Sequence, residues 1–390
     1  MHGLELTQSI EFQMSLLLFV ALAGYLLAAR ISQPAVVGEI LVGLVIGPSV
    51  LGWITYTDFV SSVAHLGAII LLFVTGLEFK LHEISSPRYA VIALFGVLLP
   101  WAGGFWTAEF FGFETHKAAL IGVAFTATSI AITADTLREM GKLHSAAAKA
   151  IIGAAIIDDI LALLALSVTE QVATGSVSTN SVLTMMFKAG IFLVAGAWAG
   201  RAIVMPLIER IDASRFAKRY PEFVFVLAMM LAFAYAMFAE LMGLSAIVGA
   251  FVAGVAMEGV NLQHSRHFKE GAEYLRVIFG AIFFVSLGIL ADIRVFTGEV
   301  ITATVAFTAV AILTKLVGCG LPARLLGMNT RDALVVGIGM APRGEVAMIV
   351  ALLALNQGVI EQAGYVSLVI MSLVTTLIVP LVLRNWLFRE

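Results

Sequence analysis

Two neighbouring aspartates, Asp158 and Asp159, lie inside an otherwise apolar run of the chain, Ala-Ile-Ile-Gly-Ala-Ala-Ile-Ile-Asp-Asp-Ile-Leu-Ala-Leu-Leu. Carboxylates at the depth of a bilayer are costly unless they are paired, protonated or hydrated. We therefore interpret them as functional residues. Four roles are open at this point: carrying an ion, carrying a proton, cutting a peptide bond and bracing a helix.

Membrane helices must position these acids, because the composition is that of a polytopic membrane protein. Of the 390 residues, 61% are hydrophobic and 13% are charged, whereas soluble domains carry about 25% charged residues. The net charge of −3 leaves no basic footprint for nucleic acid. The single cysteine, Cys319, excludes an intramolecular disulfide. We expect no cofactor, and an all-α fold.

Hydropathy divides the chain into about 13 apolar segments, each near the length of roughly 20 residues that a bilayer crossing needs. The N-terminus lacks the basic region of a signal peptide, so the first segment is expected to be retained. The expected segments are 12–29, 34–52, 60–79, 89–111, 116–138, 145–172, 181–207, 221–242, 244–258, 274–292, 299–322, 332–356 and 364–386.

Lysine and arginine are concentrated in every second connection between these segments. The other connections contain only Lys117 and Arg294. Because cytoplasmic loops carry the excess of positive charge, this pattern predicts a multi-pass protein of the cell membrane. Its N-terminus would lie outside and its C-terminus in the cytoplasm, with an odd number of spans.

The chain contains an internal repeat. Gly38 and Gly43 keep the spacing of Gly249 and Gly254. Three pairs of segments match in the same order at an offset of about 210 residues: 36–45 with 247–256, 66–73 with 279–286, and 117–123 with 332–338. An odd number of spans separates the copies, which therefore lie in opposite orientations. Inverted repeats are typical of secondary transporters.

Two segments at matching positions of the repeat carry helix-breaking residues. Thr126, Thr128 and Ser129 interrupt 116–138, and Pro342 interrupts 332–356 among several glycines. The three hydroxyls either bond back to the backbone or serve as oxygen ligands near the acids. Paired broken helices indicate a binding site at the membrane midplane.

Further charged residues lie within or beside the apolar segments. Lys315 is interpreted as the counter-charge of an intramembrane aspartate. Arg343 and Glu345 are interpreted as a structural ion pair, with each other or with neighbouring helices. A direct ion ligand is the alternative for Glu345. Glu39 and Glu78 are expected to lie on solvated faces near helix ends.

Adjacent residues of a helix point about 100° apart, so Asp158 and Asp159 cannot both face one small ligand. We therefore expect Asp159 to face an ion cavity and Asp158 to pair with Lys315. Hard monovalent cations take oxygen ligands, and the expected Na⁺ ligands are Asp159, Ser129 and Thr128. A carboxylate that binds either a cation or a proton makes the exchange obligatory.

The motifs together resemble a known family, the second family of monovalent cation:proton antiporters, and within it the bacterial sodium/proton antiporter branch. The resemblance covers nearly the whole chain. Its motifs are 34–48, 72–79, Thr-Ala-Thr-Ser at 126–129, Asp158-Asp159, Phe-Phe-Val-Ser-Leu-Gly at 283–288 and Pro-Arg-Gly-Glu-Val-Ala at 342–347.

This resemblance implies one membrane transporter domain over 1–390, with 13 helices and an elevator-like movement. Scaffold helices at about 12–79 and 221–292 would form a homodimer in membrane lipid. The mobile core would comprise about 89–172 and 299–386, and a linker helix about 181–207. The resemblance also implies that Asp159 carries the ion, that Asp158 pairs with Lys315, and that the two-acid form is electrogenic. Arg343, Glu345 and Thr126 are supporting candidates.

The leading function is therefore a secondary transporter, not an enzyme, that exchanges Na⁺ or Li⁺ for H⁺. Potassium/proton exchange is the alternative within this class. An intramembrane aspartyl protease is a distant alternative, because its two carboxyls must meet across helices to share a proton. A passive channel leaves Lys315 without a role. No nucleotide-binding domain is expected after the last helix.

Overall fold

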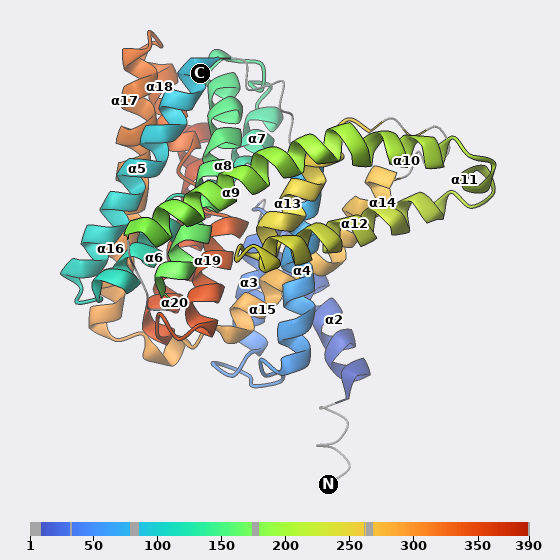
Figure 1. Cartoon of the computed structure of the whole chain (residues 1–390). Helices are drawn as coiled ribbons and strands as arrows, with labels where there is room; N and C mark the ends of the chain where they lie inside the picture. The colour runs from blue at the N-terminus through green and yellow to red at the C-terminus, as the bar shows by residue number, and fades with distance from the viewer. Residues whose placement is uncertain are drawn as a thin grey trace.

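The computed structural model is built of helices joined by turns and short loops, and the residues that it describes contain no strand. An all-helical fold is thereby confirmed. The described residues are 9–31, 33–78, 86–173, 179–260, 262 and 268–388. Figure 1 shows that α2 begins at the lower end of the bundle and that the described chain ends at the upper end.

The first half of the bundle contains α2 to α11. Their bounds are Ile10–Arg30 (α2), Ala35–Ile46 (α3), Asp58–Glu78 (α4), Pro87–Phe110 (α5), Thr115–Ala124 (α6), Ile130–Glu139 (α7), Ala146–Ala173 (α8), Thr179–Ala199 (α9), Met205–Asp212 (α10) and Arg215–Arg219 (α11). A π-helical turn, Gly200–Val204, joins α9 to α10. Figure 1 shows this long helix crossing the bundle obliquely.

The second half contains α12 to α20. Their bounds are Glu222–Leu241 (α12), Ala246–Ala256 (α13), Phe268–Leu275 (α14), Ala281–Leu290 (α15), Gly298–Lys315 (α16), Leu321–Leu325 (α17), Thr330–Gly339 (α18), Glu345–Asn356 (α19) and Gln362–Val382 (α20). The π-helical turns Arg276–Gly280 and Leu316–Gly320 join α14 to α15 and α16 to α17, and Leu383–Leu387 follows α20.

The helices suit a bilayer in length and in surface. In the described part of the chain, eight helices are long and apolar enough to cross a membrane, and α3, α13 and α19 are shorter apolar helices. Large apolar side chains cover the outer surface, among them Phe110, Val194 and Leu241. Exposed apolar side chains are favourable in contact with lipid. Helices also satisfy their own backbone hydrogen bonds, as a lipid environment requires. The number of 13 spans stays a prediction.

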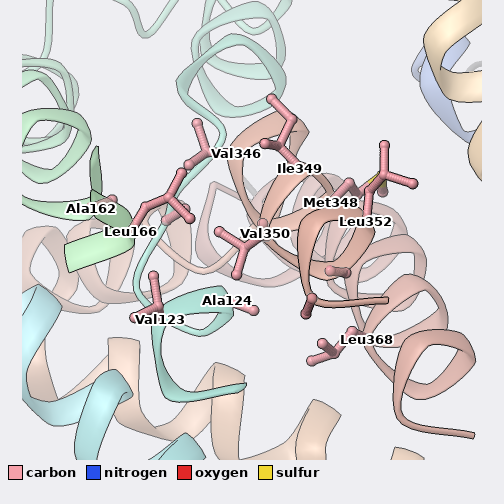
Figure 2. Packing of buried hydrophobic residues seen from close by; sticks show 14 of the residues in the cluster. Val123, Ala124, Ala162, Leu166, Val346, Met348, Ile349, Val350, Leu352 and Leu368 are labelled. Carbon is pink, nitrogen blue, oxygen red and sulfur yellow. The ribbon is translucent and has the colours of Figure 1, made fainter. Parts of the chain in front are cut away.

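Both expected interruptions are present. The chain is non-helical between α6 and α7, at 125–129, and between α18 and α19, at 340–344. The half-helices on one side of the breaks are held together by apolar packing. Figure 2 shows Val123 and Ala124 of α6 beside Leu166 of α8, Val350 of α19 and Leu368 of α20. This apolar layer lies next to the breaks, because Val123 and Ala124 are the last two residues of α6.

The repeated glycines lie where helix backbones touch. A Cβ atom added at Gly38 would come within 2.0 Å of the Gly24 carbonyl oxygen in α2, and one at Gly249 within 2.2 Å of the Tyr235 carbonyl oxygen in α12. Added Cβ atoms at Gly43 and Gly254 would meet carbonyl oxygens of α15 and α4, at 2.2 and 2.1 Å. The partner helices are equivalent in the two repeats, so the duplication extends to helix contacts.

The Gly254 contact predicts a large effect of a small change. Gly254→Ala should destabilise the protein by about 1–3 kcal/mol, because the methyl group must push α13 away from α4. The measurement is thermal unfolding of the purified protein in detergent. Gly190→Ala is the matched control, because no atom lies within 4 Å of a Cβ there. Equal melting temperatures for the two variants would contradict the prediction.

Candidate functional site

The two breaks are bonded directly to each other. The Ser129 amide donates to the Pro342 carbonyl oxygen over 2.9 Å. The Thr128 hydroxyl donates to the Met340 carbonyl oxygen over 3.1 Å, and the Thr133 hydroxyl donates to that of Gly339 over 2.6 Å. Segments more than 200 positions apart therefore form one unit. Near this unit, α6 and α18 present carbonyl ends, and α7 and α19 present amide ends.

Arg343 supplies the donors for carbonyl groups that the breaks leave unpaired. Its guanidinium is fully buried. It donates to the carbonyl oxygens of Ala127 at 3.3 Å, Met340 at 3.4 Å and Ala311 at 3.1 Å. Carbonyl groups at helix ends lack partners within the helix, and a guanidinium can donate five hydrogen bonds. Arg343 thus ties both breaks to α16.

Arg343 and Glu345 were expected to form an ion pair with each other or with neighbouring helices, but among the described residues they form neither. Arg343 bonds backbone carbonyl groups instead. Glu345, in the first turn of α19, accepts a hydrogen bond from the Ser129 hydroxyl over 3.4 Å. A Cβ atom at Gly344 would lie 2.5 Å from the Ser129 Cβ, so only glycine permits this approach.

Asp158 and Lys315 form an ion pair in the interior. The Lys315 ammonium at the end of α16 donates to Asp158 Oδ1 of α8 over 2.8 Å, and both side chains are fully buried. Gly96 of α5 lies next to the pair and makes room for Cys319, because a Cβ atom there would lie 2.6 Å from Cys319 Sγ, whereas Asp158 Oδ1 would be in ordinary contact at 3.7 Å. Sequence reasoning did not identify Gly96.

Asp159 lies beside this pair, but its environment differs. Its side chain is 8% exposed, and within the described ranges it has no hydrogen bond or ion pair. The Asp158 charge is balanced by Lys315, whereas the Asp159 carboxylate has no such counter-charge among the described residues. A buried charge without a partner is costly.

Three hydroxyls lie around the break in α6–α7, and their hydrogen bonds distinguish them. The Ser129 and Thr128 hydroxyls donate across to the other broken helix, and each oxygen keeps lone pairs for a cation. The Thr126 hydroxyl donates to the Val123 carbonyl oxygen over 2.8 Å and so closes the end of α6. Thr126 therefore has a local structural contact, which was one of the two expected roles.

Sequence reasoning missed a charged group beside the site. Arg276 opens the π-helical turn after α14 and bonds Glu273 through two nitrogens. Its charge also acts on Glu345, Glu39 and Glu78. Glu78 is exposed as expected, but Glu39 is only 6% exposed. The expectation of a solvated Glu39 is thus wrong, because neighbouring helices cover it. An arginine at the start of the apolar run 277–291 was the available signal.

The family model and the similar proteins found by comparison agree on one family. The model of the family described as "Sodium/hydrogen exchanger, transmembrane" matches residues 16–389. The Na(+)/H(+)-K(+) antiporter GerN of Bacillus cereus is 35% identical over 379 residues, which are 96% of this chain and 95% of GerN. A Na(+)/H(+) antiporter of Enterococcus hirae is 31% identical over 377 residues, 95% of this chain and 96% of the relative.

The fold is also that of a solved antiporter. The sodium proton antiporter MjNhaP1 from Methanocaldococcus jannaschii superimposes with a TM-score of 0.73 at 17% sequence identity. The match covers 95% of this chain and 97% of that protein. At this identity the likeness concerns the fold alone.

The buried pair predicts that removing one of its two charges lowers stability more than removing both. Asp158→Asn leaves the Lys315 ammonium buried without its partner, and breaking such a pair costs about 3–5 kcal/mol. Asp158→Asn combined with Lys315→Met removes both charges and should recover most of that loss. Thermal unfolding in detergent is the measurement, with Glu240→Gln on an exposed position as control. A melting temperature of the Asp158→Asn protein equal to that of the wild type would refute the role of the pair in stability.

Proposed function

Because the chain belongs to the sodium/hydrogen exchanger family, as the resemblance of its motifs predicted, we propose that it exchanges Na⁺ for H⁺ at Asp159. The protein is a multi-pass membrane transporter and not an enzyme. The observation that carries the proposal is the buried Asp159 carboxylate, which has no protein partner in the described structure and lies beside two interrupted helices.

The mechanism follows from the cost of leaving Asp159 charged in a low-dielectric site. A bound Na⁺ neutralises it, with the hydroxyl oxygens of Ser129 and Thr128 as further ligands and water completing the shell. A proton neutralises it equally well. Because the two cannot bind the carboxylate together, each displaces the other. With either ligand on Asp159, the site crosses between the two faces.

Lys315 has a separate task in this mechanism. It neutralises Asp158, so that the adjacent acid does not repel the charge that Asp159 carries between exchanges. The pair also fixes α8 against α16, next to the π-helical turn that follows Lys315. Such turns are frequent at functional sites. Arg343 and Glu345 support the site by holding the breaks and by orienting the Ser129 hydroxyl.

Alternating access needs two bodies that move against each other. The helix contacts support a scaffold that comprises 12–79 and 221–292, and a core that comprises 89–172 and 299–386. In the proposed scaffold, α4 packs on α13 and α3 on α15. In the proposed core, α5 packs on α6, α8 and α16. The long helix α9, with α10, is the linker. We propose that the core moves like an elevator against a scaffold that forms a homodimer in lipid, with the N-terminus outside and the C-terminus cytoplasmic.

Substituting the carrier acid tests the function. Asp159→Asn should abolish cation-driven proton movement in proteoliposomes that contain a pH-sensitive dye, because the amide carries neither ion nor proton. Glu240→Gln, which removes an exposed carboxylate, should keep the wild-type rate. Retained exchange by the Asp159→Asn protein would rule out Asp159 as the carrier.

The same vesicles compare Na⁺, Li⁺ and K⁺ on the wild-type protein. Na⁺ and Li⁺ should drive more proton movement than K⁺. The name of GerN includes K⁺, so potassium exchange is the specific alternative, and an equal or larger K⁺ response would favour it.

If the Ser129 hydroxyl is a Na⁺ ligand, its removal should weaken the affinity for Na⁺ more than it lowers the maximal exchange rate. Ser129→Ala should raise the half-saturating Na⁺ concentration about tenfold, the usual loss for one bond to a charged group, with a smaller change in maximal rate. Thr136→Ala is the control, because that buried hydroxyl donates to the Ile132 carbonyl oxygen in its own helix. An unchanged half-saturation value for Ser129→Ala would argue against its role as a ligand.

A further inference from the structure

A cavity of about 340 Å³ lies away from the aspartates, where α5 and α8 both begin. The loop that follows α17 closes its third side with Leu326, Gly327 and Met328. Arg331, just beyond this loop, donates to the Leu387 carbonyl oxygen near the end of the described chain. The cavity therefore lies at the upper end of the bundle in Figure 1.

Two cationic side chains line the cavity. Arg88 and Lys149 are exposed lining residues. Neither forms an ion pair in the described part of the chain. Arg88 is the second residue of α5 and Lys149 the fourth of α8, and neither helix has an acidic residue in its first turn. Positive side chains there add to the positive end of each helix dipole. Among the described residues, the cavity thus carries two positive charges without a paired carboxylate.

The lining combines polar and apolar groups. Ser86 and Tyr89 add hydroxyl groups beside the two cations. Two buried apolar residues also line the cavity: Ile92, one turn after Arg88 on α5, and Ala150, which directly follows Lys149 on α8. The outer surface beside it is also apolar, with Val91 and Leu94 exposed on α5 and Leu325 on α17. A ligand with an anionic head and an apolar body matches this lining.

We propose that this cavity binds a phosphate-bearing anion, with the phosphate oxygens on Arg88 and Lys149. Guanidinium and ammonium groups are the usual protein donors to phosphate. An anionic phospholipid headgroup and free phosphate share this chemistry. The ligand would bind three elements at once, α5, α8 and the loop after α17, and so stabilise the end of the body that carries Asp158, Asp159 and Lys315. The proposal does not depend on which cation the protein transports.

The test uses the full chain in a mild detergent, with three probes: phosphatidylglycerol, phosphatidylcholine and inorganic phosphate. Thermal unfolding and titration of the melting shift give an apparent affinity for each. The test variant is Arg88→Gln with Lys149→Gln. The matched control is Arg215→Gln with Lys218→Gln, which removes the same charge from exposed positions around α11, outside the cavity.

We expect phosphatidylglycerol to raise the melting temperature of the wild type and of the control, and phosphatidylcholine to have a smaller effect. The test variant should bind phosphatidylglycerol at least about tenfold more weakly. The charge-retaining variant Arg88→Lys with Lys149→Arg should keep most of the affinity, which separates lost charge from poor folding. A comparable shift with inorganic phosphate would identify a soluble anion as the ligand and still support the site.

Two results would overturn the proposal. One is an equal phosphatidylglycerol response in the test variant and in the control, because the cavity would then not be the place of binding. The other is the absence of a shift with phosphatidylglycerol and with inorganic phosphate in the wild type.

Discussion

Inside a membrane, carbonyl and amide groups freed by a broken helix find no water, so protein groups must bond them. In this protein two helices break at the same place, and the rest of the site depends on which groups bond the freed backbone. Arg343 donates to carbonyl groups of both breaks and of α16. Ser129, Thr128 and Thr133 add direct bonds between the broken segments. A fully buried cation is tolerated here because carbonyl dipoles surround it.

The same low-dielectric surroundings give the two aspartates different tasks. Asp158 meets Lys315 at 2.8 Å, and this pair is compensated within the protein. Asp159 projects from the next position of α8 and meets no such partner among the described residues. The Asp158–Lys315 pair is a structural contact, and the proposed carrier role of Asp159 rests on its lack of such a partner. One residue of helical rotation, about 100°, separates the paired acid from the proposed carrier.

The helices around the site are held together by close backbone contact as well as by side-chain packing. Lipid is as apolar as leucine, so helices in a membrane associate through close packing of small residues. Gly254 meets α4, and its repeat counterpart Gly43 meets α15. Gly96 lets α5 pack closely against Cys319, in the π-helical turn that follows Lys315. Glycine therefore determines how closely these helices approach one another.

The sequence alone determined the features that are local in the chain: the apolar helices, the two breaks, the repeat and the position of the acids. Each follows from hydropathy, helix-breaking residues or spacing, which need no knowledge of neighbours. Only the tertiary structure decided which groups meet. In the folded protein, Arg343 bonds carbonyl groups and not Glu345. Neighbouring helices bury Glu39, and Arg276 lies close enough to act on Glu345. The physical reason is that a buried charge is stabilised by partners from other helices, and helix packing selects those partners.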